Sequence, residues 1–385
     1  MTMINVFQPS LGTEELQAIS EVFETNWLGH GPRTKAFEAA FADHVGVAPE
    51  NTLFINNATA GLFLAAELLG LGPGDDVVMP SVSFVSAANA VAATGARPVF
   101  CDVDPHTLNP SAQQVEDALT PGTRAVLLLH YGGAPGDVAA VAALCRSRGV
   151  PLIEDAACAV ASGDGATKCG AFGDIGVWSF DAMKVLVTGD GGMLHVRDGE
   201  LARTARRVAY HGLEQSSGYA TAKVSDRWWD LDVKEHGRRI IGNDLTAAIG
   251  AVQLRRLPEF VQRRQEISHL YDRLLAGAEG VRLPPALPTG HHSTHYFYWV
   301  QLDPAIRDQV AGDLLARDIY TTFRYPPLHK VPAFQASHQV LPGVEEASAA
   351  TLLLPLHQGL DDAEVRTVAD ELRKAVEHRL AEAGN

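Results

Sequence analysis

Short apolar runs alternate with helix-like stretches from about residue 51 to residue 196. The apolar runs read as strands near 53–55, 77–79, 98–101, 125–129 and 152–154. They lack the polar alternation of half-exposed strands, which is typical of a parallel sheet covered on both faces. Helix-like segments lie between them near 59–70, 84–94, 111–119 and 136–148. This order predicts an α/β fold with a mostly parallel sheet sandwiched by helices.

The pattern changes after Gly192. A strand at 192–196 and a helix at 198–209 precede an irregular stretch, and a long helix then runs from about residue 244 into the 270s. The remainder predicts strands at 295–302 and 320–323 and helices at 304–317 and 361–382. We therefore expect a large domain over 12–250 and a smaller C-terminal α+β domain over 251–385, with residues 1–11 packing on the smaller one.

Composition and charge narrow the class of protein. The chain is 46% hydrophobic and 20% charged, as in ordinary globular proteins. Its formal net charge of −15 disfavours nucleic-acid binding, because its field repels polyanions. The four cysteines form no C-x-x-C pair, and no signal peptide or membrane-spanning run is evident. These features predict a cytoplasmic protein that binds neither membrane nor nucleic acid and has no Cys-rich metal site.

Ligands of parallel α/β sheets bind beyond the carboxyl ends of the strands, so the residues that follow each strand are the candidates. After the first strand, Ala58 and Thr59 enter a helix, whose backbone N–H groups and dipole can bind an anion. Helix capping by Asn57 or Thr59 is the alternative. Phe84 follows the second strand and could stack on a planar cofactor or simply belong to the core.

Two further positions suggest a particular cofactor. Asp155 ends a buried strand, where a carboxylate needs a cationic partner such as the ring nitrogen of pyridoxal 5′-phosphate (PLP). A helix cap or an arginine pair would also explain it. Lys184 lies among apolar residues, ahead of the glycine-rich turn 189–192. Desolvation by such neighbours would lower its pKa and make it a nucleophile and base. A solvated surface lysine is the alternative. Ser179 could add a hydroxyl to a phosphate site.

The order of these residues resembles the DegT-type nucleotide-sugar aminotransferases, which are fold type I PLP enzymes. The most specific motif is Ser-Phe-x-x-x-Lys followed by Thr-Gly-Asp-Gly-Gly, at 179–192. Further matching segments cover nearly the whole chain, at 27–32, 72–77, 172–176, 211–212, 247–250 and 325–329.

The resemblance implies a role for each matching residue. Lys184 would hold PLP as a Schiff base and move the proton between Cα and C4′. Asp155 would pair with the pyridinium nitrogen, and Phe84 would stack on the ring. Three groups would bind the phosphate: the Ala58 N–H, Thr59 and Ser179. The family works as a homodimer in which the partner subunit completes each active site.

The chain departs from the family pattern at three places. Asn57-Ala58-Thr59 stands for the usual Ser-Gly-Thr. Cys158 stands where the family has a Gln that touches the 3′ oxygen of PLP. Arg239 stands where the partner subunit usually supplies an Asn to the phosphate, with Asn243 as the alternative donor. None of these changes removes the lysine.

The implied activity is transfer of an amino group from L-glutamate to a nucleotide-linked keto-deoxysugar. We expect dTDP-4-keto-6-deoxyglucose, aminated at C4, in antibiotic or cell-surface sugar biosynthesis. A 3-keto sugar or a keto-cyclitol is the alternative acceptor. Candidates for contact with the nucleotide end are Trp27, Trp229, Arg324 and His329.

Two other classes of function compete with this one. A non-catalytic regulator with a PLP-type fold would have lost Lys184 or Asp155, and both are present. A zinc hydrolase could use His291, His292 and His295, but these lack a fixed spacing to an acidic residue.

Overall fold

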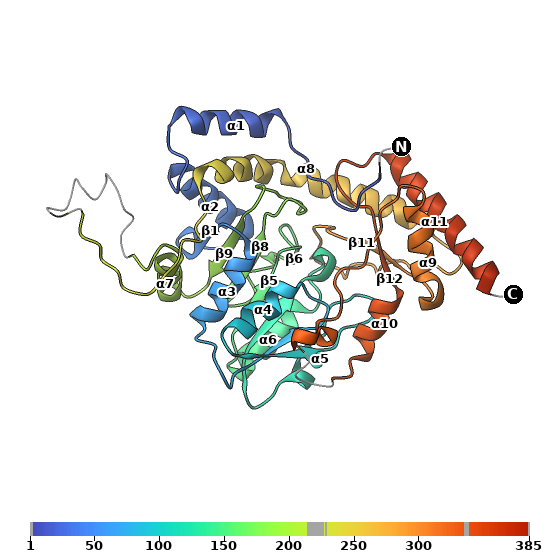
Figure 1. The fold of residues 1–385 in the computed structure, drawn as a ribbon, viewed down its shortest axis with the longest axis horizontal. Helices are drawn as coiled ribbons and strands as arrows, with labels where there is room; N and C mark the ends of the chain where they lie inside the picture. The colour runs from blue at the N-terminus through green and yellow to red at the C-terminus, as the bar shows by residue number, and fades with distance from the viewer. Residues whose placement is uncertain (1–2, 214–226, 228, 335–338, 384–385) are drawn as a thin grey trace.

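The computed structural model describes residues 3–213, 227, 229–334 and 339–383. Its centre is a seven-stranded sheet in the order β1-β9-β8-β5-β4-β2-β3 (Figure 1). The strands are β1 (Thr52–Ile55), β2 (Asp76–Pro80), β3 (Arg97–Cys101), β4 (Thr123–Leu129), β5 (Leu152–Asp155), β8 (Ile175–Ser179) and β9 (Gly192–Val196). Five neighbouring strands run parallel to one another: β8, β5, β4, β2 and β3. Strand β9 is antiparallel to both of its neighbours, β8 and β1. The expected mostly parallel sheet is therefore confirmed.

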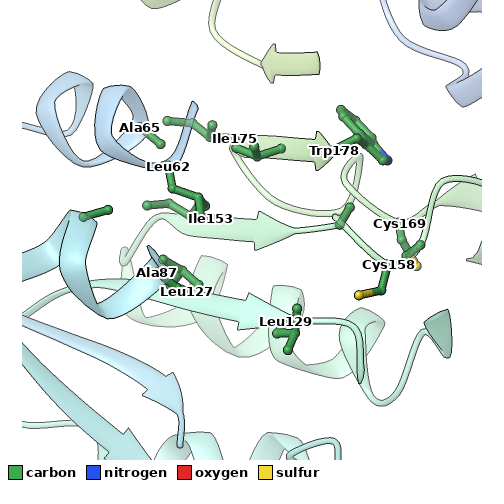
Figure 2. Packing of buried hydrophobic residues seen from close by; sticks show 14 of the residues in the cluster. Leu62, Ala65, Ala87, Leu127, Leu129, Ile153, Cys158, Cys169, Ile175 and Trp178 are labelled. Atoms are coloured by element: carbon green, nitrogen blue, oxygen red, sulfur yellow. The ribbon is translucent and has the colours of Figure 1, made fainter. Parts of the chain in front are cut away.

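Helices cover both faces of this sheet, as the apolar strands predicted. They are α3 (Ala58–Leu68), α4 (Val85–Ala93), α5 (Ala112–Ala118), α6 (Val138–Arg148) and α7 (Gly199–Ala209). Successive residues of one strand enter different cores: Leu127 packs with α3 and α4, whereas Val126 packs with α5 and α6. Figure 2 shows part of the first of these cores, with Leu62, Ala87 and Ile153 among its members. Each strand is therefore buried on both sides.

Two N-terminal helices, α1 (Thr13–Glu24) and α2 (Pro32–Val45), were not expected from the apolar pattern. They pack against α8 (Asp244–Leu275), the long helix that was expected. Glu15 of α1 accepts hydrogen bonds of 2.8 Å from Gln253 and Arg256 of α8. Asp244 accepts one of 2.8 Å from the backbone N–H of Thr34 in α2. These contacts join the N-terminal helices to the start of the long helix.

The C-terminal part forms a second hydrophobic core. This core is built by α9 (Pro304–Leu315), α11 (Asp362–Ala383) and a two-stranded ladder of β11 (Tyr298–Gln301) and β12 (Thr351–Leu354). The helix between them, α10 (Pro342–Ala350), buries Val344 and Ala347 in the first core instead. Ile4 packs against the second core, and its N–H donates to Asp318. α8 contributes Phe260 to the first core and Ile267 to the second. The boundary near residue 250 stays a prediction, and we propose that α8 carries the chain across it.

The expected strand at 320–323 is wrong. This stretch makes a single isolated bridge, between Thr322 and Leu353. Pro326 and Pro327 follow after two intervening residues, and proline cannot donate to a strand ladder, so the strand cannot continue through them.

Three short strands complete the described part: β6 (Gly163–Asp164), β7 (Thr167–Lys168) and β10 (His291–His292). Within the described residues, we find no helix with the length and apolar character to cross a bilayer.

Candidate active site

The strand ends meet at one pocket beside the sheet. Seven of the predicted site residues line it: Ala58, Thr59, Phe84, Asp155, Ser179, Lys184 and Arg324. They follow or end the strands β1, β2, β5 and β8, apart from Arg324, which comes from the C-terminal part. Residues more than 260 positions apart in the sequence thus share one site.

The first side of the pocket suits a phosphate. Asn57 caps α3 by accepting a 2.8 Å hydrogen bond from the Ala60 N–H, so Ala58 and Thr59 form the first turn of that helix. First-turn N–H groups lack partners within the helix and attract anions. A Cβ atom at Gly192 would lie 2.8 Å from the Ala58 nitrogen, so a glycine there lets β9 pass this turn. Ser179, at the end of β8, lines the same pocket.

The pocket also carries a carboxylate with few partners. Asp155 is 2% exposed, and the Ala157 N–H donates to it at 3.1 Å. Burial raises the pKa of Asp155, and the Ala157 N–H, Lys184 and His130 offset part of this rise. A cationic ring nitrogen would supply the charge that this carboxylate needs. The residues present therefore fit PLP in the orientation that the resemblance implies.

Lys184 lines the same pocket. Its Nζ is 3.4 Å from the Tyr296 hydroxyl and 3.9 Å from the Cys158 sulfur, and it lies 4.6 Å from the centre of the Tyr296 ring. Burial acts to lower the pKa of Lys184, but Cys158, Tyr296 and Asp155 outweigh burial and raise it. The lowered pKa of Lys184 expected from the sequence is therefore wrong for the chain without cofactor. The three acidic groups that raise this pKa are distant from Lys184 in the sequence, so the local pattern did not reveal them.

Sequence reasoning missed two tyrosines of the pocket. Tyr296 and Tyr325 both line it, although their segments were known only as an expected strand and a matching motif. Tyr325 also places its hydroxyl 3.7 Å from the sulfur of Cys158, which lies 2% exposed behind the lining. Tyr296 is held through its backbone, since its N–H donates to Gly132 and its carbonyl accepts from Arg264. Their placement depends on how the C-terminal part packs on the sheet.

Besides Cys158, five predicted residues lie outside this pocket. Asn243 caps α8 by accepting from the Thr246 N–H at 3.0 Å, and His329 is buried with its Nδ1 2.7 Å from the Ser81 hydroxyl. Trp27, Trp229 and Arg239 are exposed to solvent. Capping and core packing thus account for Asn243 and His329, and the structure does not bring any of the five to the cofactor position of their own chain.

The three histidines of the zinc alternative are scattered. His291 and His292 form β10, whereas His295 lies between β10 and β11 and has its pKa lowered to about 4 by burial. Across the described ranges, no group of three potential ligands gathers around a metal position.

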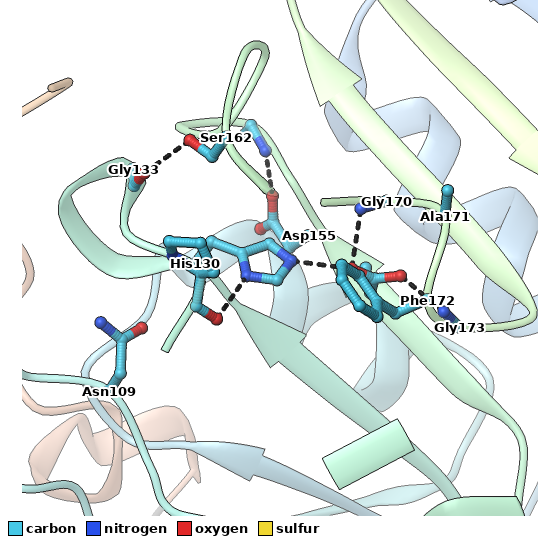
Figure 3. A network of polar contacts seen from close by, with 12 residues as sticks. Asn109, His130, Gly133, Asp155, Ser162, Gly170, Ala171, Phe172 and Gly173 are labelled. Atoms are coloured by element: carbon cyan, nitrogen blue, oxygen red, sulfur yellow. Dashed lines mark hydrogen bonds and ion pairs between the residues drawn. The ribbon is translucent and has the colours of Figure 1, made fainter. Parts of the chain in front are cut away.

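A buried ion pair lies directly behind Asp155. Glu154 accepts from His130 Nε2 at 2.9 Å and from the N–H groups of Gly170 and Gly173 at 2.7 and 2.6 Å (Figure 3). Both ionisable side chains are fully buried. Although burial opposes the charge on His130, Cys169 and Glu154 raise its pKa well above the usual value. The pair supports the strand end that carries Asp155.

Glu154→Gln should therefore lower the free energy of unfolding by about 3–5 kcal/mol, because an amide leaves one buried donor unpaired and His130 uncompensated. Urea unfolding of the cofactor-free protein measures this loss. Glu116→Gln breaks an exposed pair with Arg148 and should cost at most about 1 kcal/mol. Equal effects of the two substitutions would contradict a structural role for the Glu154 pair.

The same pair predicts a pH dependence of stability. A histidine whose pKa is raised on folding contributes stability below its unfolded pKa of about 6.5. That contribution disappears as the pH rises through the folded pKa. Wild-type unfolding free energy should thus fall on the alkaline side, and Glu154→Gln should flatten this slope. An unchanged slope would show that His130 is neutral in the folded protein.

A family model described as the DegT/DnrJ/EryC1/StrS aminotransferase family matches residues 9–373. The chain belongs to this family. It is 65% identical over 380 residues, 99% of this chain and 98% of the relative, to a dTDP-4-dehydro-2,3,6-trideoxy-D-glucose 4-aminotransferase from Saccharopolyspora spinosa. It is 34% identical over 96% of both chains to the spore coat polysaccharide biosynthesis protein SpsC from Bacillus subtilis.

A solved structure gives the same result for the fold. The aminotransferase TlmJ from Streptoalloteichus hindustanus superposes with a TM-score of 0.93 at 58% identity, covering 98% of this chain and 99% of its own. Membership of the family confirms the expected fold, the aminotransferase activity on a sugar substrate with an amino donor, and PLP as the cofactor.

Proposed function

We propose that this chain transfers the amino group of L-glutamate to C4 of a dTDP-linked 4-keto-2,3,6-trideoxyhexose, with Lys184 as the PLP-binding lysine. The observation that carries the proposal is the convergence of Lys184, Asp155 and the first turn of α3 on one pocket. The name of the 65% identical relative favours C4 over a 3-keto sugar or a keto-cyclitol. It also favours a trideoxy sugar over the 6-deoxyglucose expected from the sequence.

Each side of the pocket would hold one part of the cofactor. The Ala58 N–H, Thr59 and Ser179 would bind the phosphate, and Phe84, which is 46% exposed in the single chain, would cover a ring face. Asp155 would pair with the ring nitrogen and keep it protonated. When bound, PLP would withdraw electrons from the carbon that carries the amino group.

Lys184 would then carry out the proton transfers. Its Nζ lies within reach of the Tyr296 hydroxyl, which can orient the amine when it is not bonded to the cofactor. As a free base, it would take the proton from Cα of the donor and return a proton at C4′. In the second half of the cycle it would perform the same two transfers in reverse order, on the sugar.

A two-fold dimer with shared active sites would complete this arrangement. Support comes from large apolar side chains left exposed on a single chain: Trp27, Leu28, Trp229, Leu231 and Val233. Arg239 lies outside its own pocket, as a residue supplied to a partner's phosphate site would. Free, buried cysteines suit a reducing compartment, and we place the enzyme in the cytoplasm.

The absorption spectrum of the purified protein tests the proposal. PLP bound to Lys184 should give a visible band, which L-glutamate should convert to a near-ultraviolet band. Adding the dTDP-4-keto sugar should then restore the visible band and yield a 4-amino sugar by NMR. A protein that stays colourless after PLP is added would overturn the assignment of Lys184. Restoration only by a 3-keto sugar or a keto-cyclitol would overturn the choice of acceptor.

A further inference from the structure

The proposed reaction requires one pocket to accept two different anions in turn. In an amino-acid donor, the α-carboxylate is attached to the same carbon as the reacting amine. In the sugar nucleotide, the negative charge is a diphosphate at C1, across the hexose ring from the keto carbon C4. A cation close to Lys184 would therefore meet the donor's α-carboxylate, whereas a cation for the diphosphate must lie farther away.

Arg324 is a cation that lines the same pocket as Lys184. Of the residues that line the pocket in the described chain, Lys184 and Arg324 carry the cationic side chains. The Arg324 guanidinium lies 5.0 Å from the centre of the Phe7 ring, and one of its nitrogens is 3.9 Å from the sulfur of Met183, the neighbour of Lys184. Phe7 stacks on Tyr296 at 5.6 Å, and Tyr296 reaches Lys184. The guanidinium thus stands at the reacting end of the pocket.

This guanidinium also lacks a protein anion. Arg324 is half-buried, yet in the described residues its side chain contacts Met183 and Phe7 and no carboxylate. A partly desolvated cation without an acidic partner is unfavourable until an anion arrives. Its backbone is anchored, since the buried Tyr131 hydroxyl donates to the Arg324 carbonyl. The site is therefore built to present an unpaired fork of N–H donors, the geometry that matches a carboxylate.

We propose that Arg324 binds the α-carboxylate of the amino donor and so selects an α-amino acid over a simple amine. This inference rests on the proposed function and gives Arg324 a role different from the one expected at the nucleotide end. Charge pairing at this position would also orient Cα toward the Lys184 nitrogen. The ketosugar, which has no carboxylate, would enter the same space without this contact.

The two half-reactions, measured separately in single turnover, test the proposal with Arg324→Gln and Arg324→Lys. The donors are L-glutamate and 4-aminobutyrate, which is glutamate without its α-carboxyl group. In Arg324→Gln, the rate constant at low glutamate should fall about 10- to 100-fold, as for loss of a charged hydrogen bond. The rate with 4-aminobutyrate and the rate of the sugar half-reaction should not change. Arg324→Lys should give an intermediate loss, because it keeps the charge but not the fork.

A binding measurement and a control complete the design. Calorimetry of 2-oxoglutarate with the PLP form of the enzyme, which holds no amino group to transfer to it, should show weaker binding in Arg324→Gln by a similar factor. Arg366→Gln, an exposed arginine of α11, should leave every value unchanged. Loss of the sugar half-reaction alone would place Arg324 at the diphosphate and overturn the inference, as would equal losses in both half-reactions or no loss at all. Failure of the wild type to react with glutamate would instead overturn the proposed function.

Discussion

Lys184→Arg is expected to abolish amino transfer while the protein remains folded. An arginine side chain keeps the positive charge, but its guanidinium cannot be deprotonated and so cannot remove a proton from Cα. Loss of a positioned acid–base group lowers rates by about 10²- to 10⁴-fold, and we expect the upper end because one lysine serves both half-reactions. Single-turnover rates with L-glutamate and with the ketosugar measure this loss.

Two controls separate chemistry from folding. Lys374→Arg changes an exposed lysine of α11 that pairs with Glu371 and should leave both rates unchanged. The thermal unfolding of Lys184→Arg should resemble that of the wild type when both lack cofactor. Turnover near the wild-type rate in Lys184→Arg would remove Lys184 from the mechanism and require another base among the pocket residues.

Asp155→Asn should separate activity from stability. The amide cannot stabilise a protonated ring nitrogen, so we expect the rate of the glutamate half-reaction to fall about 10²- to 10³-fold, the range for loss of one preorganised electrostatic group. The free energy of unfolding, in contrast, should not fall. The wild-type carboxylate is buried with a raised pKa, so removing its charge should leave the cofactor-free protein as stable as before or more stable.

The pH dependence of that stability difference has a definite sign. Because the folded pKa of Asp155 is raised, the folded protein still holds a proton where the unfolded chain, with a pKa of about 3.9, has lost it. Wild-type stability therefore falls as the pH rises through this interval. In urea unfolding at several pH values, the free energy of unfolding of Asp155→Asn relative to that of the wild type should increase over the same interval. Asp370→Asn, an exposed control, should show no such trend, and a destabilised Asp155→Asn would point to a structural role.

Much of the site could be predicted because the carboxyl ends of parallel strands lie at the same edge of the sheet. Ala58, Phe84 and Asp155 follow or end strands whose apolar runs are visible in the sequence, so their convergence needs no long-range information. Lys184 could be predicted from its apolar neighbours and the glycine-rich turn that follows it. Tyr296 could not be placed in this way. It reaches Lys184 through a backbone held by Gly132 and Arg264, and such tertiary hydrogen bonds leave no local pattern.

The errors in the fold have similar causes. The segment at 320–323 has residues that favour a strand, but tertiary packing gives it a single isolated bridge. The helix α2 carries recognisable signals, with Pro32 at its first turn and Gly46 in a left-handed conformation at its end. Its apolar face was harder to recognise, because it packs Phe37 and Phe41 into an aromatic cluster with Phe180, far along the chain.

The four buried cysteines can report local opening of the structure. None is more than 3% exposed, and burial raises the pKa of Cys101 to about 12 and that of Cys145 to about 11, so little reactive thiolate is present near neutral pH. A thiol reagent can therefore modify them only when the surrounding structure opens. Cys101 ends an edge strand of the large sheet, Cys145 lies in α6, and Cys158 lies beside Lys184. The order in which a mass spectrometer finds them labelled would show which part of the protein opens first.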